Sequence, residues 1–390
     1  MAKAIAVRKV LVARGHEVLV AVSQKNAAFM AFHDVPHAVL PDLQESDGCG
    51  FPSVEWFRSL SNITDNIKAQ LRLVEEYKPD RVLGIFHFTI KAVAAMAGVP
   101  FDSLVCGCML PEFSGALGYA EDEIEGEWQQ GLMAGFFRYA GRKLSQGLSL
   151  LDQPAIEDSR MMLVGERTFL WDFPEFLPVV KGSDLIHVGP ISWSEWPCDK
   201  RYWNILQTGG RPLAIISFGT CVGNADGALR LVRVLGELGF HVLLTAAARL
   251  KLDERMKKES WLTVCEFAPF HLLLPQASLL VSHGGQMSIF EALSQKVPVA
   301  VMPFQPEQAH NGVCLERLGC GKRLVPGQPF LGDPGVYLKA LTNIKDEDLA
   351  ETFMKLVHPE CTEKLGRAAD ILGRYHGALD VAPYLEGANG

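Results

Sequence analysis

The fold is decided by residues 279–291, LLVSHGGQMSIFE. This stretch begins with an apolar run typical of a buried strand, passes through two glycines and continues as the start of a helix. Glycines allow the backbone to approach a phosphate closely, and the free N–H groups at a helix N-terminus attract anions. The stretch therefore predicts a strand–turn–helix unit that binds a phosphate group.

Three side chains in this unit have the chemistry of a nucleotide site. His283 follows the strand and can donate a hydrogen bond to a diphosphate. Ser288 is expected to cap the first helical turn and to bond a phosphate oxygen, and Glu291 can accept both hydroxyls of a ribose. A Gly-Gly pair at a strand–helix turn is also compatible with a purely structural role. The surrounding loops are therefore needed to distinguish a binding site from a structural turn.

Three further loops follow predicted strands of the same domain. Ser217-Phe218-Gly219-Thr220 follows strand 213–217, Phe267-Ala268 ends strand 262–267 with a ring on which a base could stack, and Glu307-Gln308 follows strand 298–303. Ligands of open α/β sheets bind at the carboxyl ends of the strands. Together these loops predict a nucleotide-diphosphate-sugar site formed by Ser217, Gly219, Thr220, Phe267, Ala268, His283, Gly284, Gly285, Gln286, Met287, Ser288, Glu291, Glu307 and Gln308.

The rest of the chain predicts two α/β domains. Strand-like runs such as 18–22, 82–85 and 101–105 alternate with helical segments, a pattern typical of βαβ units and a doubly wound parallel sheet. A polar, proline-containing stretch interrupts the alternation, and a second series then begins. We therefore expect an N-terminal acceptor-binding domain over 1–192, a linker over 193–211, a nucleotide-sugar domain over 212–375 and a tail over 376–390 that packs back on the first domain.

The overall composition excludes some classes of protein. The chain has 390 residues and a formal net charge of -8, which argues against binding to nucleic acid through its backbone. No apolar run reaches the ~18 residues of a membrane span. Nine cysteines without framework spacing favour a reduced, cytoplasmic setting. Residues 112–148 are rich in aromatic residues and predict helices that either pack on the core or form an acceptor-facing or peripheral membrane surface.

Most of the chain resembles glycosyltransferase family 1, especially the bacterial macrolide and rhamnolipid glycosyltransferases. The resemblance is strongest over 267–324, where the order and spacing of the donor motif are matched by Phe267, Pro269, His283-Gly284-Gly285, Ser288, Glu291, Pro298, Pro303, Glu307-Gln308 and Asn311. It implies two Rossmann-like domains that face each other across a cleft, the GT-B fold. It also implies that His283 holds the diphosphate, Glu291 the ribose, and Glu307-Gln308 the sugar.

The same resemblance implies a reaction. A hexosyl group moves from a UDP- or dTDP-sugar to a hydroxyl of a lipophilic acceptor, with inversion and without a metal or other cofactor. Phe267 and Phe270 stand where many relatives carry tryptophan and glutamine, which leaves the base open. An acidic triplet, Asp346-Glu347-Asp348, could suggest a metal site, but it precedes a helical segment and predicts a helix N-terminus instead.

The first residues of the sequence depart from the family pattern. The family begins with a strand and a Gly-His loop that carries the catalytic base, whereas Met1-Ala2-Lys3 already belongs to the following helix. The expectation is that the strand and loop are absent, with His87 as the remaining candidate for a catalytic or acceptor-binding role and a structural histidine as the alternative. A base-less, nucleotide-sugar-binding regulatory protein is a second hypothesis. A sugar-nucleotide epimerase is a third, although it would need acid/base carboxylates in the cleft.

Overall fold

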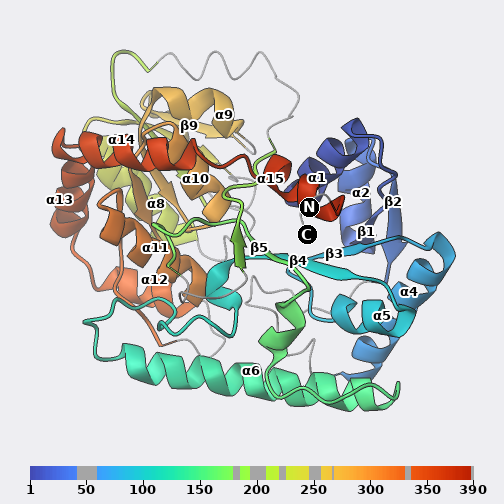
Figure 1. Ribbon diagram of the computed structural model, residues 1–390. Helices are drawn as coiled ribbons and strands as arrows, with labels where there is room; N and C mark the ends of the chain where they lie inside the picture. The colour runs from blue at the N-terminus through green and yellow to red at the C-terminus, as the bar shows by residue number, and fades with distance from the viewer. Residues whose placement is uncertain are drawn as a thin grey trace.

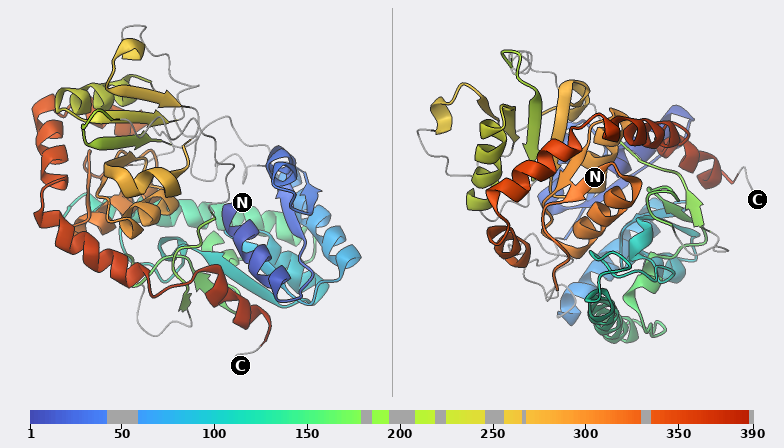
Figure 2. Two further views of the ribbon diagram at one scale, coloured as in Figure 1. Left: turned by 90° about the horizontal axis from the view of Figure 1, so that it is seen from above. Right: turned by 90° about the vertical axis from the view of Figure 1, so that its left-hand side faces the viewer.

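The computed structural model describes residues 1–41, 59–178, 185–193, 208–218, 225–245, 256–265, 268–329 and 335–387. Three of the predicted donor-site residues, Gly219, Thr220 and Phe267, lie outside these ranges, as does most of the predicted linker. The architecture is the predicted one, with mixed α/β structure and parallel strands in two halves of the chain. Figure 2 shows the strands of the C-terminal half grouped together, apart from the blue and cyan strands of the N-terminal half.

The C-terminal half contains a six-stranded parallel sheet in the order β12-β11-β10-β7-β8-β9. Its strands are β7 (Leu213–Ser217), β8 (His241–Thr245), β9 (Leu262–Cys265), β10 (Ala277–Ser282), β11 (Val299–Val301) and β12 (Gly321–Arg323). The helices of this half are α8 (Ala225–Glu237), α9 (Phe270–Leu273), α10 (Gln286–Ser294), α11 (Pro306–Leu318), α12 (Gly335–Thr342), α13 (Asp346–Leu356) and α14 (Glu360–Leu372).

Strand β10 lies in the middle of this sheet. It pairs in parallel with β7 on one side and with β11 on the other, and Leu279 to Ser282 are buried. A strand whose two faces are both covered is built from a continuous apolar run, which explains why residues 279–281 lack the polar alternation of a surface strand. The carboxyl end of β10 is consequently held by a neighbour on each side, and the predicted phosphate-binding loop starts there.

The strands of the N-terminal half fall into two separate parallel sheets. One contains β1 (Val20–Ser23) and β2 (His37–Leu40), and the other has the order β3 (Val82–Ile85), β4 (Phe101–Val105), β5 (Thr168–Leu170), β6 (Leu185–His187). Within the described residues, no hydrogen-bonded ladder joins β1 to β3. The helices of this half are α1 (Ala2–Ala13), α2 (Gln24–Phe32), α4 (Leu60–Tyr77), α5 (Ile90–Ala97) and α6 (Gly126–Ser149).

Helix α15 (Ala378–Leu385), which follows α14, lies against α1 of the N-terminal half, as Figure 1 shows near the label of the chain start. Next to it, the Glu386 carboxylate accepts hydrogen bonds from Arg14 and His16, each at 3.0 Å. Further contacts between the halves are the ion pair of Arg323 with Glu123 at 2.9 Å and a bond from Arg317 to the Phe176 carbonyl. The two halves therefore contact each other at several separate places.

Residues 112–148, for which an exposed apolar surface was one of the two predictions, expose large apolar side chains only at a few positions. They form an irregular stretch followed by the long helix α6, which runs along one side of the molecule (Figure 1). Ile124 is 88% exposed and Trp128 is 53% exposed, whereas Met133, Phe137 and other residues of α6 are buried. Among the described residues, no helix has both the length and the apolar character to cross a bilayer.

Candidate functional site: the glycine loop after strand β10

The glycines of the loop are required by close packing. Gly284 has a φ of +90°, in the left-handed region that side chains disfavour. A Cβ at this position would lie 2.6 Å from the Gln308 carbonyl oxygen and 2.8 Å from Val301 Cγ1. The Gly284 carbonyl also accepts a hydrogen bond from Asn311 Nδ2 at 2.9 Å. The loop is thus clamped against β11 and α11, which fixes the course of the backbone into the next helix.

Helix α10 begins at Gln286, and Gly285 is its N-cap residue. The prediction that Ser288 caps the first turn is wrong, because Ser288 is already the third helical residue and no described side chain caps this end. The N–H groups of the first turn have no intrahelical acceptor, and without a side-chain cap they need a partner from outside the helix. An uncapped N-terminus with the positive end of the helix dipole is suited to a phosphate group.

His283 lies between β10 and this helix end. Burial lowers the pKa of its imidazole to about 4, and a hydrogen bond with the Ser217 backbone opposes the shift only in part. The ring is therefore neutral at pH 7. Its Nδ1 atom is buried and makes no hydrogen bond to any described residue. Because a buried polar atom normally has a partner, this unpaired nitrogen beside an uncapped helix end indicates a ligand. It can donate to a diphosphate oxygen when it, rather than the nitrogen bonded to the Ser217 backbone, carries the proton of the neutral ring.

Two carboxyl groups lie on the elements that follow. Burial raises the pKa of Glu291, on α10, to about 7, and it also raises the pKa of Glu307, at the start of α11, to about 7. Glu307 Oε1 accepts a hydrogen bond from Asn311 Nδ2 at 2.6 Å. The same Asn311 side chain bonds the Gly284 carbonyl, so it couples the predicted sugar contact to the phosphate loop. Gln308 is buried, and its Oε1 accepts a hydrogen bond from the Phe304 backbone N–H at 2.9 Å.

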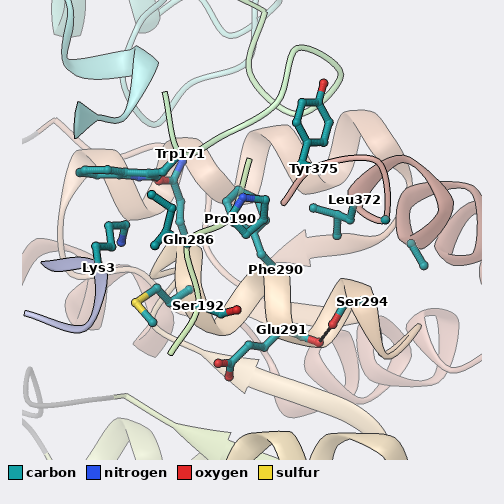
Figure 3. Close-up of a pocket in the computed structure, with 14 residues that line it drawn as sticks. Lys3, Trp171, Pro190, Ser192, Gln286, Phe290, Glu291, Ser294, Leu372 and Tyr375 are labelled. Carbon is teal, nitrogen blue, oxygen red and sulfur yellow. Dashed lines mark hydrogen bonds between the residues drawn. The ribbon is translucent and has the colours of Figure 1, made fainter. Parts of the chain in front are cut away.

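A cavity of about 300 Å³ runs along one side of α10, from Gln286 in its first turn to Ser294 at its other end, and residues of both halves of the chain line it (Figure 3). Of the predicted donor-site residues, it brings together Gln286, Met287 and Glu291. The other described members of the predicted set do not line it: Ser217, Ala268, His283, Gly284, Gly285, Ser288, Glu307 and Gln308. The remaining lining residues are Lys3, Trp171, Pro190, Ile191, Ser192, Phe290, Ser294, Ala369, Leu372, Gly373 and Tyr375.

Lys3 and Trp171 reach this cavity from the N-terminal half and were not predicted. Trp171 follows β5, and its indole Nε1–H donates a hydrogen bond of 2.5 Å to Gln286 Oε1 on α10. The Lys3 ammonium lies 4.4 Å from the centroid of the Trp171 ring. The feature that could have indicated a role for Trp171 is its position at the carboxyl end of a parallel strand. That strand, β5, has only three residues and no distinctive sequence pattern, so it was not predicted. Nothing in the sequence around Lys3 marks it as part of a site.

His87 lies just after β3, as predicted, but it does not line the cavity. Burial lowers the pKa of its imidazole to about 4. Its Nδ1 is 3.4 Å from the Thr89 backbone nitrogen, which donates to it. The residue is neutral at pH 7, and in the tautomer that accepts this bond its unprotonated nitrogen is Nδ1. A general base needs this nitrogen free, so the bond with Thr89 would have to open for His87 to take a proton. Its catalytic role stays a prediction.

The acidic triplet begins a helix, as predicted. Asp346, Glu347 and Asp348 form the first turn of α13, where carboxylates interact favourably with the helix dipole. The Asp346 carboxylate accepts a hydrogen bond from Arg230 Nε at 2.6 Å and so ties α13 to α8. This arrangement gives the triplet a structural function at the surface of the C-terminal half.

Two α/β halves with parallel strands, and a glycine loop between a central strand and an uncapped helix, have the arrangement that the resemblance to GT-B glycosyltransferases implies. The sequence profile of the family described as UDP-glucoronosyl and UDP-glucosyl transferase matches residues 147–358, more than half of the chain. The chain belongs to this family.

Individual relatives agree with this assignment. A PGL/p-HBAD biosynthesis rhamnosyltransferase of Mycobacterium bovis is 23% identical over 346 residues, which is 82% of this chain and 69% of that protein. A demethyllactenocin mycarosyltransferase of Streptomyces fradiae is 32% identical over 120 residues, covering 30% of this chain and 26% of that protein.

Solved structures show the same fold. The glycosyltransferase of kitacinnamycin has a TM-score of 0.73 at 18% identity, covering 99% of this chain and 94% of that chain. The spinosyn forosaminyltransferase SpnP has a TM-score of 0.71 at 18% identity, covering 99% of this chain and 95% of that chain.

Proposed function

We propose that this glycosyltransferase moves a hexosyl group from a UDP- or dTDP-sugar to a hydroxyl of a lipophilic small-molecule or lipid acceptor, with inversion and without a metal ion. The observation that carries the proposal is the uncapped N-terminus of α10, which lies between His283, with its buried and unpaired Nδ1 atom, and Glu291. This arrangement suits a ligand with a diphosphate and a ribose, and the remaining glycosyl group would extend towards Glu307.

The assignment of roles follows from the chemistry of each group. The first-turn amides of α10 and the His283 imidazole bind the diphosphate, and the Glu291 carboxylate accepts the ribose hydroxyls. Glu307, held by Asn311 at 2.6 Å, accepts hydroxyls of the transferred sugar. The solved structure of the spinosyn rhamnosyltransferase SpnG, with a TM-score of 0.68 and 16% identity, contains thymidine diphosphate. For this reason dTDP-sugars deserve priority beside UDP-sugars.

The proposed reaction is a single displacement. The acceptor oxygen bonds to the anomeric carbon, the bond from that carbon to the diphosphate oxygen breaks, and a general base removes the acceptor proton. Donors aimed at the leaving diphosphate stabilise the charge that develops on it, which is the largest single contribution in many transferases. His87 is the proposed base, because it is a neutral imidazole at a strand end of the acceptor-binding half.

The decisive experiment combines binding with turnover. UDP- and dTDP-sugars are screened for thermal stabilisation of the protein, since a ligand of the native state raises its melting temperature. Each donor that binds is then assayed with hydroxyl-bearing lipophilic acceptors, in EDTA and in added magnesium. We expect equal turnover in both conditions and a product of inverted anomeric configuration. Turnover that EDTA abolishes and magnesium restores would exclude the metal-independent mechanism.

A further inference from the structure

Lys3, from the N-terminal half, is the positively charged residue among the described residues that line the cavity. It lies in the first turn of α1, and it lines the same cavity as Gln286 and Met287 of the first turn of α10 (Figure 3). The two elements are bridged by Trp171, which donates to Gln286 and stacks its ring under the Lys3 ammonium. A lysine and a helix N-terminus thus face one cavity from two domains.

The charges around Lys3 leave its ammonium without a counter-ion. Within the described residues, Lys3 Nζ makes no hydrogen bond or ion pair. It makes a cation–π contact with the Trp171 ring, whose centroid lies 4.4 Å away. The attraction of Glu307 and Cys106 is outweighed by desolvation, which lowers the pKa of the Lys3 ammonium. A partly buried cation that lacks a carboxylate partner is costly, unless a ligand supplies the negative charge.

A second, independent feature of the cavity also calls for a ligand. Gln286 is only 6% exposed, and its Oε1 is engaged by the Trp171 indole. Its Nε2 atom is buried and has no partner among the described residues, although Gln286 lines the cavity. A side-chain amide and a cation therefore belong to residues that line the same cavity, next to the uncapped first turn of α10, and N–H donors and a cation both complement an anion.

We propose that Lys3 binds the donor diphosphate from the N-terminal half, opposite the first turn of α10. The inference rests on the proposed function, since it assigns a further residue to the same donor site. Its consequence is that the diphosphate contacts both halves of the chain at once. Lys3 would stabilise the charge on the departing diphosphate, which is the role that a metal cation has in metal-dependent transferases.

The test compares two lysine substitutions with a distant control. Lys3→Met removes the charge but keeps most of the apolar side chain, and Lys3→Arg keeps the charge. Lys143→Met, in helix α6 next to Tyr139, is the matched control. The affinities of UDP and dTDP are measured by calorimetry, and those of uridine and thymidine by ligand-observed NMR. We expect Lys3→Met to weaken the nucleoside diphosphates by about ten- to a hundredfold. Lys3→Arg and Lys143→Met should bind like the unsubstituted protein, and nucleoside affinity should not change.

The outcomes separate the two proposals. If the unsubstituted protein binds neither UDP nor dTDP, the proposed function fails and the role of Lys3 fails with it. If His283→Ala weakens the diphosphate while Lys3→Met binds it normally, the donor site stands and the inference about Lys3 is wrong. Equal losses for nucleoside and nucleoside diphosphate in Lys3→Met would show a structural effect of the substitution and would also overturn the inference. The melting temperature of each variant identifies any that does not fold.

Discussion

The two halves of the molecule differ in how their sheets support the site. In the C-terminal half, β10 pairs with β7 and β11, and the loop that follows is clamped by Asn311 and by the backbone of α11. In the N-terminal half, β3 pairs with β4 alone in the described residues, and His87 follows directly after it. The backbone at the end of a central strand is held in place by hydrogen bonds to two neighbouring strands. A residue that follows an edge strand has such bonds on one side only and depends more on local packing.

The two histidines illustrate this difference. His283 and His87 are both neutral at pH 7 because burial lowers the pKa of each to about 4. His283 lies at a loop whose course is fixed by close backbone contacts, and it has an unpaired Nδ1 atom. His87 already accepts a bond from the Thr89 backbone. The same protonation state is therefore proposed to serve a donor contact in one half and a proton acceptor in the other.

The largest effect is expected for the proposed base. His87→Gln should lower kcat by about 10²–10⁴-fold with little change in donor KM, since general-base catalysis contributes that much. A base works in its unprotonated form, so a pKa near 4 predicts an activity that stays level from pH 8 down to about pH 5 and falls below that. The exposed His358 provides a control, as His358→Gln should have no effect. A rate that His87→Gln leaves unchanged would place the base elsewhere.

The next effect concerns the donor contact in the C-terminal half. His283→Ala should weaken nucleoside diphosphate binding by about 1.5–3 kcal/mol, the usual value of a hydrogen bond to a charged group. The fold should survive because the residue lies in the loop between β10 and α10. Calorimetry measures the affinity, and circular dichroism confirms the fold. Unaltered diphosphate affinity in a folded variant would remove His283 from the donor site.

A smaller effect compares the two sheets directly. Val281, in β10, is fully buried between two neighbouring strands, and Val22, in β1, is 8% exposed with one neighbour. We expect Val281→Ala to lower the free energy of unfolding by about 2–3 kcal/mol and Val22→Ala by about 1 kcal/mol, since the cost of a cavity depends on how far the site can relax. Urea unfolding measures both. An equal decrease in the free energy of unfolding for the two variants would contradict the proposed difference in rigidity.

The smallest effect concerns Glu307, whose pKa is raised to about 7. An acid with a raised pKa in the folded state binds its proton more tightly there than in the unfolded chain, so its ionisation destabilises the fold as pH rises from about 4.5 to 7. Glu307→Gln should therefore raise the free energy of unfolding at pH 8 by about 1–2 kcal/mol and leave it unchanged at pH 4. Melting temperatures at the two pH values test this. A variant that is less stable at pH 8 would refute it.

The C-terminal half could be predicted in most of its elements from the sequence. Strand 213–217 is β7 without change, and the predicted helix over 307–318 is α11 within one residue. Such elements are continuous apolar runs or helical patterns bounded by glycine and proline, so their local signal is strong. The predicted cap at Ser288 was wrong because the cap position depends on the exact residue at which the helix begins, which is Gln286.

The sequence by itself determined the family, the α/β fold and the glycine loop between a strand and a helix, because these follow from the order and spacing of residues along the chain. Only the tertiary structure decided what reaches that loop from elsewhere. Lys3 and Trp171 meet Gln286 across more than a hundred positions, and Asn311 joins the phosphate loop to Glu307. The raised and lowered pKa values also depend on burial, which arises when distant segments pack together and exclude water.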